Sequence, residues 1–186
     1  SLVILTAAAS AAAWPQWADS ARIWAEQNGL SDVFLQSPDM LVTRGQTTQM
    51  LYEAAGSPAV SAELPFDDVP EAYAAAVTWA AANGIVTGYG DGRFGLNAPV
   101  TRQQIAAILW RYDGSETVET AASFTDSASI SSYAAHAVNW AAANGIIAGR
   151  HDGSRDPTGT ATLAQVDVIL YRYLTGPASQ TPDHGE

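Results

Sequence analysis

Residues 79–85 read Trp-Ala-Ala-Ala-Asn-Gly-Ile, and residues 140–146 repeat the same seven amino acids. A looser copy, Trp-Ala-Glu-Gln-Asn-Gly-Leu, occupies residues 24–30. A second motif follows each copy, reading Thr-Arg-x-Gln twice and Thr-Leu-Ala-Gln once, and it begins at Thr43, Thr101 and Thr162. Two signals in fixed order, at a period of about 60 residues, indicate three copies of one supersecondary unit. Such units pack on one another, so function is expected where the copies meet.

The spacing predicts repeats over residues 14–60, 61–118 and 119–174. Residues 1–13 are apolar and then small, and they are interpreted as an N-terminal arm or the remnant of a signal peptide. Residues 175–186 are polar and rich in Pro and Gly, which is typical of a disordered tail or a linker.

We expect a mainly α-helical fold of three helix-loop-helix repeats with short extended or β segments. Each Thr-x-x-Gln is a capping box that starts a helix with an apolar stripe, and Asn83-Gly84 predicts the end of the preceding one. The three capping-box helices are expected to pack together around a pseudo-threefold axis, because no other partner has a matching length. Helices are predicted near 71–83, 101–113, 134–144 and 162–174, with shorter or shifted counterparts near 15–28 and 43–55.

The formal net charge is −11, from 19 acidic and 8 basic residues. This balance argues against nucleic acids and anionic membrane surfaces as partners. No apolar run approaches the roughly 18 residues needed to cross a bilayer, so membrane insertion is not expected. The absence of Cys excludes disulfides and thiolate metal sites.

Two arginines, Arg44 and Arg102, directly follow a helix N-cap. A positive charge is unfavourable there by a few tenths of a kcal/mol, which suggests a function. Free N–H groups, the helix dipole and a guanidinium together would bind a carboxylate or phosphate. The alternative is a solvated arginine, or one paired with Asp67, Asp68 or Asp91. Both arginines are expected on exposed first turns.

The tryptophans fall into two groups. Trp24, Trp79 and Trp140 recur at one place in the repeat, which favours a core role over stacking on a sugar. The tryptophans outside the pattern are candidate surface stacking platforms: Trp14, Trp17 and Trp110.

No metal, cofactor or catalytic site is predicted. The loop Gly90-Asp91-Gly92 lacks the acidic ladder and distal Glu of a calcium loop. His136, His151 and His184 have no metal-ligand spacing, and no Ser/His/Asp set has a local signature. The Asp67–Asp68 pair could serve acid/base chemistry, but a structural turn or cap is the favoured interpretation. The chain is not expected to be an enzyme.

The combined pattern resembles the S-layer homology (SLH) domain. It reads Phe-x-Asp … Trp-Ala-x-x-x-Gly-Ile-x-x-Gly-x-x-Asp-Gly-x-Phe … Thr-Arg-x-Gln. Residues 66–112 match closely, residues 124–173 lack the motif arginine because Leu163 replaces it, and residues 14–54 are degenerate.

The resemblance implies a three-pronged helical unit that binds a secondary cell-wall polymer without covalent attachment. It further implies grooves between repeats, a pyruvylated amino sugar as ligand, and a secreted protein at the bacterial cell surface. A catalytic or S-layer domain could be joined to the chain in a longer protein. The residues predicted to contact the anionic glycan are Arg44, Arg102, Thr43, Thr101, Gln46, Gln104, Trp79, Asp68, Gly90, Asp91 and Gly92. The third groove, beside Leu163, lacks the arginine.

Two alternatives remain open. A degenerate unit of this family could serve protein–protein contact, as the missing arginine and the decayed first repeat suggest. The chain could also be the accessory region of a secreted wall or polysaccharide hydrolase.

Overall fold

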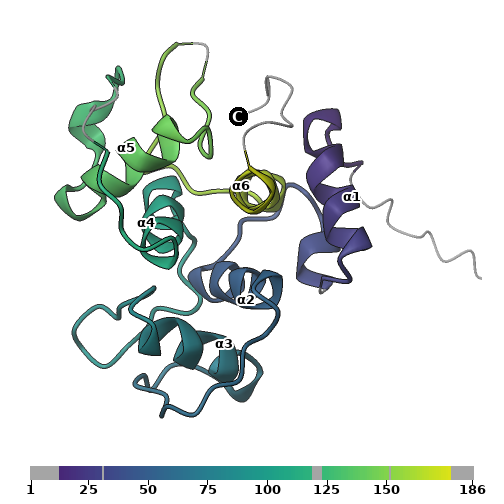
Figure 1. Ribbon diagram of the computed structural model, residues 1–186, viewed down its shortest axis with the longest axis vertical. Coiled ribbons are helices and arrows are strands. Elements are labelled where there is room, and N and C mark those ends of the chain that lie inside the picture. The colour runs from purple at the N-terminus through teal and green to yellow at the C-terminus, as the bar shows by residue number, and fades with distance from the viewer. Residues whose placement is uncertain (1–12, 31, 119–122, 151, 177–186) are drawn as a thin grey trace, which may run out of the picture.

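A computed structural model describes residues 13–30, 32–118, 123–150 and 152–176. The described chain is mainly helical, and three inner helices (α2, α4, α6) are surrounded by three outer ones (α1, α3, α5) in a three-pronged arrangement (Figure 1). The bounds are α1 Asp19–Gln27, α2 Arg44–Ala54, α3 Glu71–Ala82, α4 Arg102–Tyr112, α5 Ala135–Ala143 and α6 Leu163–Thr175. Short 3-10 turns cover Gln16–Ala18, Asp32–Leu35, Ser127–Ser129 and Ser132–Ala134. The six predicted helices and the mainly α class are confirmed.

Local sequence accounts for the helix ends. The capping box is present at α2, α4 and α6, where the backbone N–H of the threonine donates to the glutamine Oε1 at 2.9, 3.0 and 3.1 Å. The outer helices α3 and α5 end as predicted, with Gly84 at φ 69° and Gly145 at φ 67°. Only glycine adopts this left-handed conformation without steric cost.

A closed ring of backbone hydrogen bonds lies at the centre of the fold. The N–H of Val42 donates to Ala161 O (3.1 Å), that of Ala161 to Val100 O (3.0 Å), and that of Val100 to Val42 O (2.8 Å). All three residues are fully buried and directly precede the capping-box threonines. Extended pairing in the described residues amounts to three isolated antiparallel bridges around this ring. The ring defines the pseudo-threefold axis.

The prongs are built from neighbouring repeats. The inner helix α2 packs on α3, α4 packs on α5, and α6 packs back on α1. The prediction that the inner helices have only one another as partners is therefore wrong, because each finds the first helix of the following repeat. The inner helices α4 and α6 also contact each other through Tyr112 and Tyr173, whose ring centroids lie 6.0 Å apart. The pairing of α6 with α1 closes the chain on itself.

Trp79 and Trp140 belong to the core, as predicted, and Trp24 is half-buried against it. Trp79 is 7% and Trp140 is 3% exposed. The Trp79 ring lies 5.5 Å from that of Tyr52 and 5.7 Å from that of Tyr112.

The tryptophans outside the pattern are half-buried. Trp14 and Trp17 pack on a small cluster formed by α1 and α6. Trp110 donates to Glu116 O at 2.6 Å and stacks on His136.

The predicted N-terminal arm or signal remnant lies outside the described residues except for Ala13, and the predicted tail lies outside them beyond Gly176.

Candidate functional site

The first amides of the inner helices are occupied by the neighbouring repeat. The N–H of Arg44 donates to Ala98 O at 2.9 Å, and that of Gly45 donates to Leu96 O at 3.0 Å. The same two bonds run from Arg102 and Gln103 to Gly159 and Pro157, and from Leu163 and Ala164 to Met40 and Pro38. The expectation of free N–H groups for an anion is therefore wrong, because the chain's own carbonyls take them.

The Arg44 guanidinium clamps the loop of the second repeat. Its Nε donates to Phe94 O (3.3 Å), and its Nη2 donates to Thr87 O (3.0 Å). It lies over the rings of Tyr89 and Phe94, with the central carbon 5.0 and 4.8 Å from their centroids. Arg44 is 7% exposed. The clamp joins the first repeat to the second, through residues that are 50 and 43 positions apart in the sequence.

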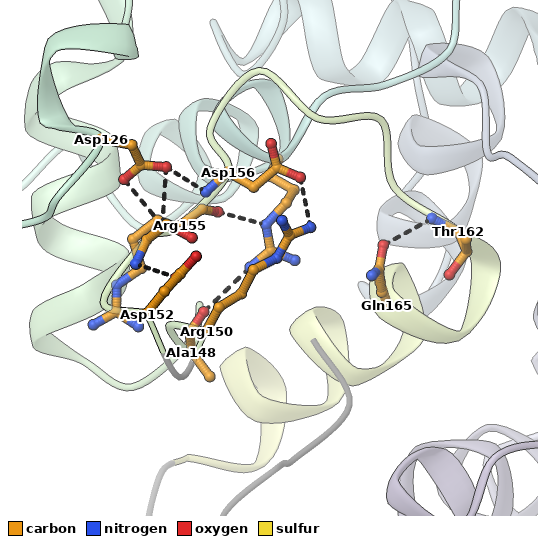
Figure 2. Close-up of polar contacts among 10 residues, drawn as sticks. Asp126, Ala148, Arg150, Asp152, Arg155, Asp156, Thr162 and Gln165 are labelled. Atoms are coloured by element: carbon orange, nitrogen blue, oxygen red, sulfur yellow. Dashed lines mark hydrogen bonds and ion pairs between the residues drawn. The ribbon is translucent and has the colours of Figure 1, made fainter.

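Arg102 repeats this clamp one repeat later. Its Nε donates to Arg155 O (2.8 Å) and its Nη2 to Ala148 O (3.2 Å), contacts that end in the loop drawn in Figure 2. Arg102 is 3% exposed. The expectation that both arginines lie on exposed first turns is wrong, and so is pairing with a loop aspartate as their main contact. Each guanidinium reaches into the adjacent repeat and satisfies its carbonyl groups.

Aspartates of the Phe-x-Asp motif hold the same loops from the other side. The carboxylate of Asp68 accepts backbone N–H bonds from Phe94 (2.7 Å), Gly95 (2.8 Å) and Leu96 (3.4 Å). Asp126 similarly accepts from Arg155 and Asp156 in the third repeat (Figure 2). Burial opposes the charged form of Asp68, but the three N–H donors outweigh it and lower its pKa. The favoured interpretation of this motif as a structural cap is confirmed.

A cavity of about 260 Å³, here called the Arg44 cavity, opens beside the first clamp. It lies between the first and second repeats, with Tyr133 of the third at its edge. Its lining comprises Arg44, Val86, Thr87, Gly88, Tyr89, Gln104, Ala107, Ile108, Arg111 and Tyr133.

The Arg44 cavity has a positive lining in an acidic protein. Two arginines and no carboxylate line it, although acidic residues outnumber basic ones by 19 to 8. Among the described residues, neither Arg44 nor Arg111 forms an ion pair. Burial lowers the pKa of the Arg44 guanidinium, and the positive charge of Arg111 acts in the same direction. An anionic ligand would relieve this unfavourable pairing of like charges.

Two tyrosines flank the opening. Tyr89 is 58% and Tyr133 is 49% exposed, which is unusual for such large apolar rings. Burial of one side raises the pKa of Tyr133, so its hydroxyl is neutral at physiological pH. Each ring offers an apolar face and a hydrogen-bonding tip.

Of the predicted site residues other than Arg102, two line the cavity and the rest lie elsewhere. Arg44 and Gln104 line the cavity. Thr43, Thr101 and Gln46 cap helices. Trp79 lies in the core, and the Asp68 carboxylate holds the loop of the second repeat. Gly90, Asp91 and Gly92 form an exposed turn in which the Asp91 carboxylate accepts the Arg93 N–H, and they are not among the lining residues.

Sequence reasoning missed Arg111, Tyr89 and Tyr133. Arg111 lies nine positions after Arg102, beyond the motif, and the first repeat has Glu53 at that place. A comparison of the repeats past the capping box would have revealed it. No local signal points to Tyr133, which comes from a different repeat.

The described residues contain no group of three or more side chains suited to hold a metal ion. Within the same part of the chain, no helix has the length and hydropathy needed to cross a bilayer.

Comparison with known proteins identifies the repeats. The sequence model of the S-layer homology domain matches residues 65–106 and 123–166. An endoglucanase from Bacillus sp. (strain KSM-635) is 34% identical over 148 residues, covering 77% of this chain and 16% of that protein. Exoglucanase XynX from Acetivibrio thermocellus is 31% identical over 153 residues, covering 78% of this chain and 14% of that protein. The chain thus spans about a sixth or less of these relatives.

The matched segments contain Asp68 and Asp126, whose carboxylates hold the two loops, and the clamp formed by Arg102. The S-layer homology domain is a binding unit rather than a catalytic one. Residues 65–106 and 123–166 are therefore two S-layer homology domains, and domains of this family anchor bacterial proteins at the cell wall.

Proposed function

We propose that the chain is a non-covalent cell-wall anchor that binds an anionic secondary cell-wall polymer, with a pyruvylated amino sugar, in the Arg44 cavity. The observation that carries the proposal is the pair Arg44 and Arg111 in one cavity without a carboxylate. A ketal-linked pyruvate is a small carboxylate, which suits a cavity lined by two guanidinium groups.

The geometry supports distinct roles for the lining residues. Arg44 is held by its two carbonyl bonds, which use its Nε and Nη2. Arg111 supplies a second charge and the Gln104 side chain is a further polar group. Tyr89 and Tyr133 supply exposed aromatic surface for contact with a sugar ring. We assign Arg102, by contrast, to the clamp between the second and third repeats.

The test is calorimetric titration of purified wall polymer, with and without its pyruvyl groups, into three variants. Arg111→Gln removes a half-buried charge that has no ion-pair partner among the described residues, so the fold should remain intact. Arg44→Gln removes the clamped charge, and Arg93→Gln is the control, because it changes net charge equally on an exposed turn outside the cavity.

We expect Arg111→Gln and Arg44→Gln each to lose about 1.5–3 kcal/mol of binding free energy, the contribution of a hydrogen bond to a charged group. Arg93→Gln should bind like the parent, and removal of pyruvate should weaken binding of the parent protein. Unchanged affinity in both cavity variants would reject the anion site and favour the protein–protein alternative.

A second proposal concerns the longer protein. We propose that this anchor is joined to a catalytic domain that acts on polysaccharide. The support is that both relatives are glucanases, of which the similar region is a small part. Sequencing of the flanking gene regions, followed by a cellulose hydrolysis assay of the complete protein, tests it; flanks without a catalytic domain would reject it.

A further inference from the structure

Arg111 lines a second cavity as well as the first. This cavity, here called the Trp79 cavity, has a volume of about 300 Å³. It is lined by Ala55, Pro58, Trp79, Asn83, Ile85, Arg111 and Tyr112. Since Arg111 forms part of both walls, the two cavities adjoin at the C-terminal end of α4.

The Trp79 cavity has the lining of a sugar site. The rings of Trp79 and Tyr112 form one wall, with their centroids 5.7 Å apart. The Asn83 amide is fixed, because its Nδ2 donates to Trp79 O at 2.8 Å, and its Oδ1 remains as an acceptor. No carboxylate lines this cavity either. Aromatic walls with a few fixed polar groups are typical of small-molecule sites.

The Arg44 cavity alone is small for an oligosaccharide, and the Trp79 cavity only reaches the lower end of the usual range. Ligand sites commonly measure about 300–1,000 Å³, and the two cavities together fall within this range, whereas the Arg44 cavity by itself does not. A polymer end that occupies the Arg44 cavity must leave it in some direction. The continuation past Arg111 offers a second positive contact and then the two rings.

We propose that the Arg44 and Trp79 cavities form one extended cleft that binds at least two successive sugar units of an acidic glycan. The acidic terminal sugar lies against Arg44, and the next sugar lies beside Trp79 and Asn83. Arg111 contacts the glycan where the two cavities meet. This inference rests on the proposed function of the Arg44 cavity and adds the length of glycan that the cleft selects.

The third repeat provides a natural contrast. The crevice at the matching place is lined by Trp140, Asn144, Ile146, Arg172 and Tyr173, but it measures only about 140 Å³ and includes Asp113. The carboxylate of Asp113 accepts the Tyr173 hydroxyl at 3.0 Å. A smaller crevice with a negative wall suits an acidic glycan poorly. Asn144 also donates to its own tryptophan carbonyl, at 2.9 Å, so it matches Asn83 in local structure.

The experiment is isothermal titration with three synthetic probes: the methyl glycoside of a pyruvylated N-acetylhexosamine, and the disaccharide and trisaccharide that end in it. The parent chain should bind the disaccharide and trisaccharide at least 10-fold more tightly than the monosaccharide. Asn83→Ala and the cavity-filling Ala55→Phe should lose most of this gain and keep the affinity for the monosaccharide. Asn144→Ala, which removes an equivalent helix-end hydrogen bond, should keep the full gain.

The outcomes separate this inference from the function on which it rests. If the parent binds all three probes with equal affinity, the extended cleft is rejected and the Arg44 cavity stands. If longer probes still bind more tightly to both Asn83→Ala and Ala55→Phe, the glycan leaves the Arg44 cavity in another direction and the proposal is overturned. If no probe binds, the proposed function itself fails.

Discussion

The junctions at Arg44 and Arg102 use one clamp in two different surroundings. Both guanidinium groups donate to two carbonyls of the next loop. At the first junction the neighbours are the rings of Tyr89 and Phe94, and the space beside the clamp is the Arg44 cavity. The corresponding positions of the third repeat are Arg150 and Arg155.

The second junction carries its own counter-charge. Arg150 Nη2 pairs with Asp156 at 2.7 Å, and Figure 2 shows the two side chains facing each other beside Arg155. The guanidinium of Arg155 lies 5.0 Å from the centroid of the Phe124 ring. The comparison shows that the motif arginine is first a structural link between repeats. Whether a junction binds an anion depends on the residues around that link.

The largest expected effect tests whether the repeats share one core. Trp79→Ala and Trp140→Ala should each lower the free energy of unfolding by about 3–5 kcal/mol, because each removes a large buried ring. Urea unfolding followed by circular dichroism would measure this. Normal stability with reduced glycan binding would instead make these rings stacking platforms.

The next effect separates the two clamps. Arg44→Ala and Arg102→Ala should each destabilise the fold by about 2–4 kcal/mol, because carbonyl groups lose charged hydrogen-bond donors. Glycan affinity, measured well below the unfolding temperature, should fall only for Arg44→Ala. An equal fall for Arg102→Ala would show that the second junction binds glycan as well.

A third test compares α6 with α4, where Asp167 stands in the place of Ala106. Asp167 is 1% exposed, and neither of its carboxylate oxygens has a hydrogen-bond partner among the described residues. Burial raises its pKa to about 9, so the folded protein holds a proton that the unfolded chain releases near pH 3.9. Between these pKa values the unfolded state binds fewer protons, so the free energy of unfolding falls as pH rises.

This slope should approach about 1.4 kcal/mol per pH unit in the parent protein. Asp167→Ala should reduce it and stabilise the fold near pH 7, because it removes an unpaired polar group from the interior. Urea titrations of both proteins between pH 5 and pH 8 would measure the difference. Parallel pH profiles would contradict the assignment of a neutral buried carboxyl.

The smallest effect is expected at the third junction. Leu163 is fully buried, so Leu163→Ala would create a cavity and lower the stability of the fold. A loss of glycan affinity could then reflect partial unfolding. Leu163→Met nearly conserves volume and should cost less than about 1.5 kcal/mol. Calorimetry should find its glycan affinity unchanged, because this junction has no motif arginine. A loss of affinity would indicate that the third groove contributes to binding.

Local patterns predicted the helices and their ends well. The capping boxes and the Asn-Gly stops depend on residues within four positions of each other, so the sequence contains the whole interaction. Burial of Trp79 and Trp140 followed from their repeat spacing. The exposure of Arg44 and Arg102 was predicted wrongly, because their partners, such as Thr87 and Ala148, lie more than 40 residues away.

The sequence alone determined the repeat, the mainly α-helical class, the helix caps and the family, since each is written in short-range spacing. The tertiary structure decided which inner helix meets which outer helix, how the ring of Val42, Val100 and Ala161 closes, and which arginine lines a cavity. Arg44, Arg111 and Tyr133 come from three repeats, and their meeting depends on closure of the pseudo-threefold ring. Long-range hydrogen bonds and packing fix that closure, and no single repeat contains them.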